Sequence, residues 1–331
     1  MKFSIIVPTY NYGHFITQCL KSIAEQVYTN WECVIIDNAS TDHTEEICKP
    51  FLNDSRFIYH RLSENKGPSI ARNYALNKIS GEYVLFLDAD DTIETNKLHS
   101  ANQIIKANNV DVVFTDHAFF KSSPDDIYSV HKMEEKFQVG LVKSINVNKF
   151  LISGNIFVIS SPITRKQVFD KIGFFDEKIK YNEDWELWLR MSFESILFYY
   201  DASSDTRTLI RNHSSSHSKD DITMYLSGIY VCNKNIGRFR GIDKKEFKLK
   251  LLSQRYLLTK MLFERFYSGQ KERKDLLLSL DINPLGVNEL FFLRKILSLI
   301  PKFMVPMYLF ILKIRYVLLR NAISLNLYTC L

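Results

Sequence analysis

The chain has 331 residues, 46% of them hydrophobic and 24% charged, a globular balance that allows one large domain with an appendage or two domains. Its five cysteines show no CxxC spacing, so they indicate neither a zinc site nor a disulfide framework and favour a reducing cytoplasm. The net charge of +6 is uneven, because residues 1–231 hold 24 Lys and Arg against 30 Asp and Glu, whereas residues 232–331 hold 19 against 7, which suggests two different partners.

Strand and helix patterns alternate through the first 120 residues. The opening MKFSIIVPTYNYG turns polar too soon for a signal peptide and predicts a buried first strand. Short apolar runs predict strands at residues 3–10, 31–38, 56–62, 82–91 and 110–120. Helical spacing and capping residues predict helices between them at residues 13–28, 40–52, 67–79 and 95–109. This alternation predicts an α/β fold with a mainly parallel, Rossmann-like sheet flanked by helices.

The later part of the chain is less regular. Residues 121–150 are expected to be a polar excursion, and residues 181–193 to form a helix rich in Trp and Leu. From about residue 222 onward the pattern is helical. We therefore expect two regions, a domain at residues 1–220 and a helical C-terminal region at residues 221–331.

Polar clusters follow three of the predicted strands. They lie at Pro8 to Asn11, at Asp37 and Asn38, and at Asp88 to Asp91. Ligands of such sheets bind in the crevice beyond the carboxyl ends of the strands, so all three clusters are expected at one binding edge.

The carboxylates in DADD, residues 88–91, have three readings: a helix cap, a solvated turn or a divalent-metal site. In an extended backbone Asp88 and Asp90 point the same way, and two such carboxylates are costly without a cation. A hard ion such as Mg²⁺ or Mn²⁺ would satisfy them, and spacing alone leaves the choice open. Asp91 is assigned to the helix expected next.

Two further positions can be interpreted either as purely structural or as functional. Asp37 either forms an Asx turn or accepts a hydrogen bond from a nucleobase or ribose. Gly67 at a helix start and Arg72 one turn later suit a phosphate or carboxylate partner. A GxGxxG fingerprint is absent near the first strand, which argues against a dinucleotide-binding dehydrogenase.

Residues 3–218 resemble the family 2 glycosyltransferases of the A-type fold. SIIVPTYNYGHFITQCLKSIAEQVYTNWECVIIDNASTD is similar to their nucleotide-binding signature, and ENKGPSIARNYAL and YVLFLDADD to the next two blocks, the second with the DxD motif. YNEDWELWLR resembles the block with the Glu-Asp pair, and RNHSSSHS the histidine-serine segment that follows it. One departure is Asn38-Ala39, where members commonly have Asp-Gly, and we expect it to alter loop shape rather than activity.

The resemblance implies roles for the donor-binding residues. Pro8, Thr9, Tyr10 and Asp37 would hold the nucleoside. Gly67 and Arg72 would line the nucleotide pocket, or Arg72 would instead brace nearby acidic residues. Within the DxD motif of Asp88, Ala89 and Asp90, Asp88 would contact the ribose or a metal-bound water. SGN, residues 153–155, would belong to a loop over the donor sugar.

The resemblance also implies the metal site and the base. Asp90 would bind Mn²⁺ or Mg²⁺ bridging the two phosphates of a nucleotide-sugar, and His213 would complete the site. Asp184 would be the general base, whereas on sequence alone Glu183-Asp184 reads better as a solvated helix N-terminus. Attack opposite the leaving group would invert the anomeric carbon.

The excess of Lys and Arg in residues 232–331 predicts a partner different from that of the acidic N-terminal part. Residues 244–266 have helical apolar spacing with many Lys and Arg, and the apolar run Phe303 to Leu312 is too short to span a bilayer. This composition fits helices in an anionic membrane interface, with a buried hairpin or dimer contact as the alternative. We expect a peripheral protein at the inner face of the plasma membrane, without a nucleic-acid partner.

The prediction is therefore an inverting, metal-dependent hexosyltransferase that uses a nucleotide diphosphate-sugar, with UDP as the favoured nucleotide, as the resemblance implies. Its acceptor would be a lipid-linked saccharide in bacterial O-antigen, lipooligosaccharide or capsule synthesis. The alternatives are a non-catalytic, membrane-associated nucleotide-sugar-binding protein and a nucleotidyltransferase, although the latter generally carries a Gly-rich basic loop after its first strand, where this chain has PTYNYGHF.

Overall fold

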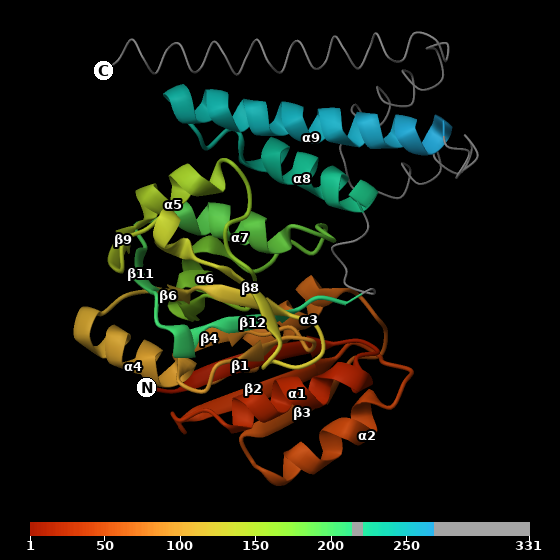
Figure 1. Cartoon of the computed structure of the whole chain (residues 1–331), viewed down its shortest axis with the longest axis vertical. Helices are drawn as coiled ribbons and strands as arrows, with labels where there is room; N and C mark the ends of the chain where they lie inside the picture. The colour runs from red at the N-terminus through yellow and green to blue at the C-terminus, as the bar shows by residue number, and fades with distance from the viewer. Residues whose placement is uncertain (214–220, 268–331) are drawn as a thin grey trace. The chain divides into compact units, whose positions relative to one another are not determined.

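The computed structural model describes residues 1–213 and 221–267, which belong to two units (Figure 1). The first unit comprises Met1–Leu151, Asn155–Glu177 and Glu183–Ser216, and the second takes Ile152–Gly154, Lys178–Asn182 and the chain from His217 onward. The main division therefore falls a few residues before the boundary expected at 220, and two short inner segments belong to the second unit.

The first half of the main sheet is parallel, as predicted. Strands β1 (Phe3–Thr9), β2 (Trp31–Asp37), β3 (Phe57–Arg61) and β4 (Tyr83–Phe86) lie in the order β3-β2-β1-β4. They are linked by α1 (Gly13–Ala24), by α2 (Thr44–Cys48) with the 3₁₀ turn Lys49–Asn53, and by α3 (Pro68–Leu76). Strand β2 is buried throughout, as expected for a strand covered on both faces.

Helices cover both faces of this sheet. Alternate residues of β1 join one apolar cluster with α1 and with α4 (Lys97–Asn108), including Ile5, Ile16 and Leu98. Helix α3 contacts β1 and β2 through a buried face with Ala71 and Ala75, which lie outside that cluster. The sheet is therefore held between two helical layers.

The second half of the sheet is mixed, which the sequence did not predict. Strand β10 (Ile163–Arg165) runs antiparallel between β4 and β6 (Val112–Thr115), β11 (Leu197–Asp201) runs parallel to β6, and β9 (Gly140–Lys143) forms the antiparallel edge. Strands of three or four residues are too short to show a period in the sequence.

A second sheet follows the order β5-β12-β7-β8, from Thr92–Ile93, Thr208–Arg211, His117–Phe120 and Ile127–His131. The strand predicted at 110–120 is thus two strands in two sheets, divided at Asp116. The buried Asp116 carboxylate accepts hydrogen bonds from the Tyr200 hydroxyl (2.7 Å) and the Met133 N–H (2.7 Å), which fix the bend.

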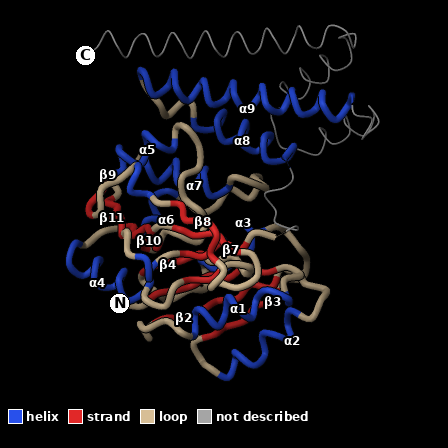
Figure 2. Tube along the Cα trace, in the orientation of Figure 1, coloured by secondary structure: helices blue, strands red, loops and turns tan. Residues whose placement is uncertain are grey.

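Residues 121–150 are not merely a polar excursion, because they contain β8, β9 and α5 (Ser144–Leu151). Strand β8 is largely exposed, so it lacks the alternation by which a half-buried strand is recognised. The tube in Figure 2 shows β7 and β8 beside each other, as their antiparallel pairing requires.

The remaining elements include α6 (Gln167–Ile172) and α7 (Glu183–Ser192) in the first unit. In the second unit α8 (Asp221–Asn235) packs on α9 (Gly241–Tyr267), which confirms the helical pattern predicted from residue 222 as far as residue 267. The apolar stretch at 286–331 lies outside the described residues. Among the described helices, none has the length and hydropathy needed to cross a membrane.

Candidate active site

Three carboxylates converge directly after β4. Oxygens of Asp88, Asp90 and Asp91 all lie within 4.8 Å of one another. The backbone is not extended as we expected, because the Asp91 N–H donates to the Asp88 carbonyl (3.0 Å) and closes a turn. The turn, rather than strand alternation, brings the acids together.

Asp91 does not belong to a following helix, and that expectation was wrong. It precedes strand β5, and its buried carboxylate accepts hydrogen bonds from the Arg211 N–H (3.1 Å) and the Ser160 hydroxyl (3.1 Å). Burial and the charges of Asp90 and Asp88 raise the pKa of Asp91 well above its usual range. Asp91 therefore ties the acidic turn to β12 and to the segment before β10.

Asp90 lies beside His213, the other predicted metal ligand. The His213 Nε2 atom is 2.8 Å from an Asp90 carboxylate oxygen, and the imidazole packs against the Phe15 ring at a centroid distance of 4.5 Å. Burial and Asp88 raise the pKa of Asp90, against the opposing influence of His213.

This donor set fits a hard divalent ion. Crowded carboxylates with raised pKa values are held in a costly arrangement, which a cation would relieve. Carboxylate oxygens with one imidazole suit Mn²⁺, and oxygens alone suit Mg²⁺. Asp90 and His213 are the residues that would hold the ion.

Arg72 lies between two acidic segments. Its guanidinium is only 3% exposed and makes 2.7 Å ion pairs with both Asp88 and Glu183. The sequence left open whether Arg72 contacts the donor or braces nearby acidic residues, and these two ion pairs are the bracing arrangement. Arg72 thereby joins the acidic turn to the first residue of α7.

Asp184, the predicted base, is the second residue of α7. Its carboxylate accepts hydrogen bonds from the Asn155 side-chain amide (2.7 Å) and the Trp185 N–H (2.7 Å). Burial and the neighbouring Glu183 charge raise the pKa of Asp184 to about 7. A carboxyl group with such a pKa can take up a proton near neutral pH.

Asp184 and the acidic turn face the same cavity. This cavity has a volume of about 390 Å³, and Asp88, Asp91, Asn155 and Asp184 are among its lining residues. Asn155 is the last residue of the SGN stretch expected over the donor sugar. A carboxylate cluster and a separate carboxyl group with a near-neutral pKa thus share one cavity.

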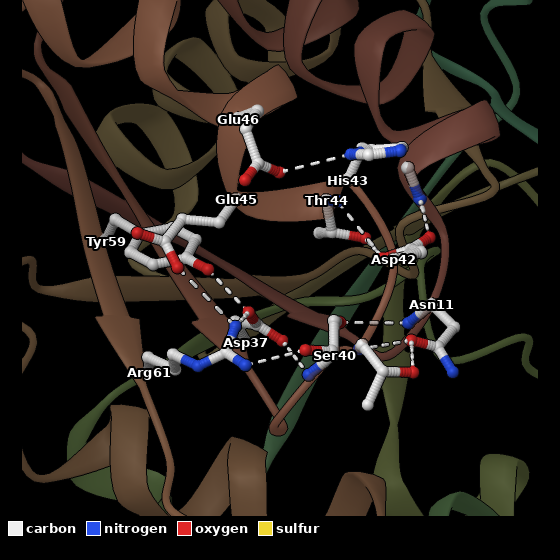
Figure 3. A network of polar contacts seen from close by, with 12 residues as sticks. Asn11, Asp37, Ser40, Asp42, His43, Thr44, Glu45, Glu46, Tyr59 and Arg61 are labelled. Atoms are coloured by element: carbon white, nitrogen blue, oxygen red, sulfur yellow. Dashed lines mark hydrogen bonds and ion pairs between the residues drawn. The ribbon is translucent and has the colours of Figure 1, made fainter.

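The residues predicted for the nucleoside lie at the ends of β1 and β2, and Figure 3 shows one of them, Asp37, with its partners. Asp37 is fully buried, and its carboxylate accepts hydrogen bonds from the Ser40 N–H (2.8 Å), the Tyr59 hydroxyl (2.5 Å) and the Arg61 guanidinium (2.7 Å). The bond to Ser40 is that of a turn, so Asp37 organises the loop after β2.

The other predicted donor-binding residues differ in exposure. Thr9 and Ala89 are buried, Pro8 is half-buried and Tyr10 is 39% exposed. Gly67 precedes α3 with φ +88°, a left-handed conformation that suits glycine.

The loops after β1 and β2 are fastened to each other. The Asn11 N–H donates to the Ser40 hydroxyl (2.9 Å), as Figure 3 shows. The Asn11 side-chain oxygen accepts from the Thr41 N–H (2.7 Å). Within this loop Ala39 has φ +65°, a left-handed conformation that costs an L-residue about 1–2 kcal/mol. The glycine common at this position in the resembling family would avoid that cost.

We therefore expect Ala39→Gly to raise the free energy of unfolding by about 0.5–1 kcal/mol, since relief of the strain exceeds the added flexibility of the unfolded chain. The measurement is equilibrium unfolding in urea. Ala107→Gly, at an exposed position within α4, is the control and should lower stability by about 1 kcal/mol. Equal losses in both variants would contradict the strain at Ala39.

Sequence reasoning missed Arg211 and Ser160. The Arg211 Nε–H donates to the Asp90 carbonyl (3.0 Å), and its guanidinium also contacts the Gln18 side chain and lies over Phe15. The Ser160 hydroxyl lies 3.3 Å from the Asp88 N–H. Arg211 opens the RNHSSSHS segment, where only the histidine was selected, and Ser160 had no distinguishing pattern.

Comparisons with known proteins find glycosyltransferases. An uncharacterized glycosyltransferase of Rickettsia typhi is 31% identical over 206 residues, which are 59% of this chain and 60% of that protein. Poly(ribitol-phosphate) beta-N-acetylglucosaminyltransferase TarS of Staphylococcus aureus is 41% identical over 116 residues, 34% of this chain and 20% of TarS. The matches thus cover less than two thirds of these relatives.

Solved structures show the same fold. S. aureus TarS 1–349 in complex with UDP-GlcNAc superposes with a TM-score of 0.67 at 20% identity, over 99% of this chain and 92% of that one. The mannosyltransferase PcManGT from Pyrobaculum calidifontis, in complex with GDP-Man and Mn²⁺, gives a TM-score of 0.55 at 18% identity, over 95% and 86% of the two chains.

The family model of glycosyl transferase family 2 matches residues 4–173. This stretch contains the parallel half of the sheet and the acidic turn. With an A-type fold around that turn, the chain belongs to glycosyl transferase family 2.

Proposed function

We propose that this protein is an inverting, metal-dependent transferase that moves a sugar from a UDP-sugar to a hydroxyl group of a lipid-linked saccharide. One observation carries the proposal: the cavity lined by Asp88 is also lined by Asp184, a carboxyl group with a pKa of about 7. Glycosyl transfer needs such a pair of sites, one for the departing diphosphate and one for the acceptor proton.

Asp184 would accept the proton of the attacking hydroxyl group. Its hydrogen bonds to Asn155 and to the Trp185 N–H fix the carboxylate before reaction. Attack from the side of Asp184, opposite the diphosphate at the acidic turn, inverts the configuration of the anomeric carbon.

The acidic turn would hold Mn²⁺ or Mg²⁺ through Asp90 and His213, with Asp88 contributing through a water. When bound, the ion neutralises charge on the diphosphate leaving group. Arg72 holds Asp88 and Glu183 in place, and Arg211 holds the carbonyl of Asp90.

The donor and acceptor are proposed on separate grounds. A UDP-sugar is supported by the fold shared with TarS, which was solved with UDP and with UDP-GlcNAc. A lipid-linked acceptor at the inner face of the plasma membrane is supported by the excess of Lys and Arg over Asp and Glu in residues 232–331. The pathway would be synthesis of a bacterial surface polysaccharide such as O-antigen, lipooligosaccharide or capsule.

The test of donor and metal binding is thermal unfolding with UDP, with and without Mn²⁺. UDP at 100 times its dissociation constant should stabilise the wild type by about 2.7 kcal/mol when Mn²⁺ is present, and Asp90→Ala should abolish the Mn²⁺-dependent part. Asp125→Asn, which removes an exposed carboxylate from the loop after β7, is the control and should respond like the wild type. An unchanged response in Asp90→Ala would refute the metal assignment.

The pKa of Asp184 predicts a pH dependence of the transfer rate. The base acts when deprotonated, so kcat/KM should fall about tenfold per pH unit below pH 7 and level off above it. The measurement is kcat/KM between pH 5 and pH 9 at constant ionic strength. A rate that stays constant down to pH 5 would contradict a base with this pKa.

Membrane attachment is tested by deleting residues 286–331. We expect the full chain to sediment with vesicles containing anionic lipid, and the shortened chain to stay in the supernatant. Continued sedimentation of the shortened chain would refute attachment through these residues.

A further inference from the structure

A group of basic side chains lines the same cavity and has no part in the proposed reaction. His117 opens β7, His131 ends β8, and the two residues face each other in the antiparallel pair. Their rings stack at a centroid distance of 4.8 Å with an interplanar angle of 23°. Lys136 joins them in the cavity lining, and we call the three residues the basic end of the cavity.

Apart from their ring contacts, the side chains of the basic end make no hydrogen bonds or ion pairs within residues 1–213 and 221–267. His117 is 6% exposed, yet neither of its ring nitrogens makes a hydrogen bond to the described part of the chain. Lys136 is half-buried and makes no ion pair there. A buried imidazole normally finds a partner, so an unpartnered one that lines a cavity indicates a ligand.

The charges around His117 give the sign of that ligand. Burial and the nearby basic groups His131, Lys97 and Lys136 lower the pKa of His117 to about 4. Near pH 7 its imidazole is therefore neutral and acts as a hydrogen-bonding group, while Lys136 supplies the positive charge of the basic end. Lys97 is itself buried, and its ammonium donates to the Thr115 hydroxyl (2.9 Å) and the Thr206 carbonyl (3.2 Å).

The acidic residue next to His117 in sequence does not offset the basic groups around that imidazole. Asp116 accepts its hydrogen bonds from Tyr200 and Met133, and no carboxylate contributes to the shifted pKa of His117. The cavity thus has carboxylates in one part of its lining and, in another, the Lys136 ammonium beside two imidazole rings. An anion is the ligand that such basic groups favour.

We propose that the basic end binds a phosphate or carboxylate group carried by one of the two sugar substrates. The anion site itself is defined by His117, His131 and Lys136. Only the statement that the bound anion belongs to a substrate rests on the proposed function. A neutral hexose would leave the Lys136 ammonium without a counter-charge, so the site selects a negatively charged sugar derivative. The charged group belongs either to the donor sugar, as in a uronic acid, or to the acceptor, as in a sugar phosphate.

The first experiment tests the anion site without any transfer. The full-length protein is titrated with glycerol 3-phosphate and with glycerol, in the presence of a chelator so that no metal binds at the acidic turn. Histidine ring resonances are followed by NMR and assigned with His117→Gln and His131→Gln. Glycerol 3-phosphate should shift the signals of both histidines, and glycerol should not.

Two variants with the same loss of charge make the test specific. Lys136→Gln removes a charge from the cavity lining and should weaken glycerol 3-phosphate binding at least fivefold. Lys132→Gln removes an exposed lysine paired with Glu134 outside the lining and should leave binding unchanged. Equal weakening in both variants, or equal shifts with glycerol and glycerol 3-phosphate, would overturn the proposal. Because Lys136 is half-buried, this comparison holds even if a histidine variant fails to fold.

The second experiment identifies which substrate carries the charge. In a transfer assay, Lys136→Gln should raise the KM for the acceptor if the acceptor is charged, and the KM for the donor if the donor sugar is charged. Enzymatic dephosphorylation of the acceptor, or replacement of a uronic acid donor by its neutral hexose, should then remove the difference between variant and wild type. Unchanged values of both KM would refute a role in substrate binding. Failure to detect transfer at all would count against the proposed function, whereas the glycerol 3-phosphate result would stand.

Discussion

Replacing Asp184 by asparagine is expected to lower kcat for sugar transfer ~10²–10⁴-fold, the usual contribution of a general base. Asparagine preserves the size of the side chain and can still contact Asn155, but it cannot take up the acceptor proton. The affinity for UDP and Mn²⁺ should stay within about twofold, because the acidic turn remains intact. Steady-state transfer and UDP titration measure the two quantities.

Glu46→Gln is the matched control for Asp184→Asn. Glu46 is an acid in the first turn of another helix, α2, and its side chain is 61% exposed. The control should transfer sugar at the wild-type rate. If Asp184→Asn also did so, Asp184 would be only a favourable charge at a helix N-terminus, and the base would have to be sought elsewhere in the cavity.

Replacing Arg72 by methionine is expected to lower the free energy of unfolding by about 3–5 kcal/mol, because two partners of a buried ion pair lose their counter-charge together. Asp88 and Glu183 would each keep a partly buried carboxylate without the guanidinium that now lies 2.7 Å from both. Urea unfolding gives the free energy, and the melting temperature should fall by roughly 6–20 °C.

The comparison for Arg72 is Arg56→Met. Arg56 pairs with Asp54 at 2.6 Å, but both side chains are about one-third exposed, so its loss should cost no more than about 1 kcal/mol. A similar loss in both variants would show that the Arg72 bridge is not the structural link between the acidic turn and α7.

The parallel half of the sheet and its binding edge could be predicted because their signals are local. Strands β1, β2 and β4 are largely apolar; β1 ends on Thr9, β2 on Asp37, and Asp88 follows β4 after one further residue, so polar groups gather at the same edge. The convergence of Asp88 and Asp90 followed from the residues themselves, although a turn rather than an extended strand produces it.

The partners of these residues could not be predicted, because they come from distant parts of the chain. Asp91 is held by Ser160 and Arg211, which are 69 and 120 residues away. The His117–His131 stack depends on the pairing of β7 with β8. Strand β8 is largely exposed, so its sequence lacks the alternating pattern that predicts a strand. Asp37 had a turn reading and a ligand reading in the sequence, and only the three-dimensional contacts with Tyr59 and Arg61 show how its carboxylate is used.

Strand β10 has a consequence for the order in which the protein folds. The parallel strands β1 to β4 lie within the first 86 residues, but β4 reaches β6 only through the three-residue strand Ile163–Arg165. Pairings between segments so distant in sequence are slow to form, because a long loop must close first. During synthesis the N-terminal half can therefore assemble while the segment with Ser160, which bonds Asp91, is still missing. We therefore expect the acidic turn to acquire its final shape late, once both Ser160 and Arg211 have reached Asp91.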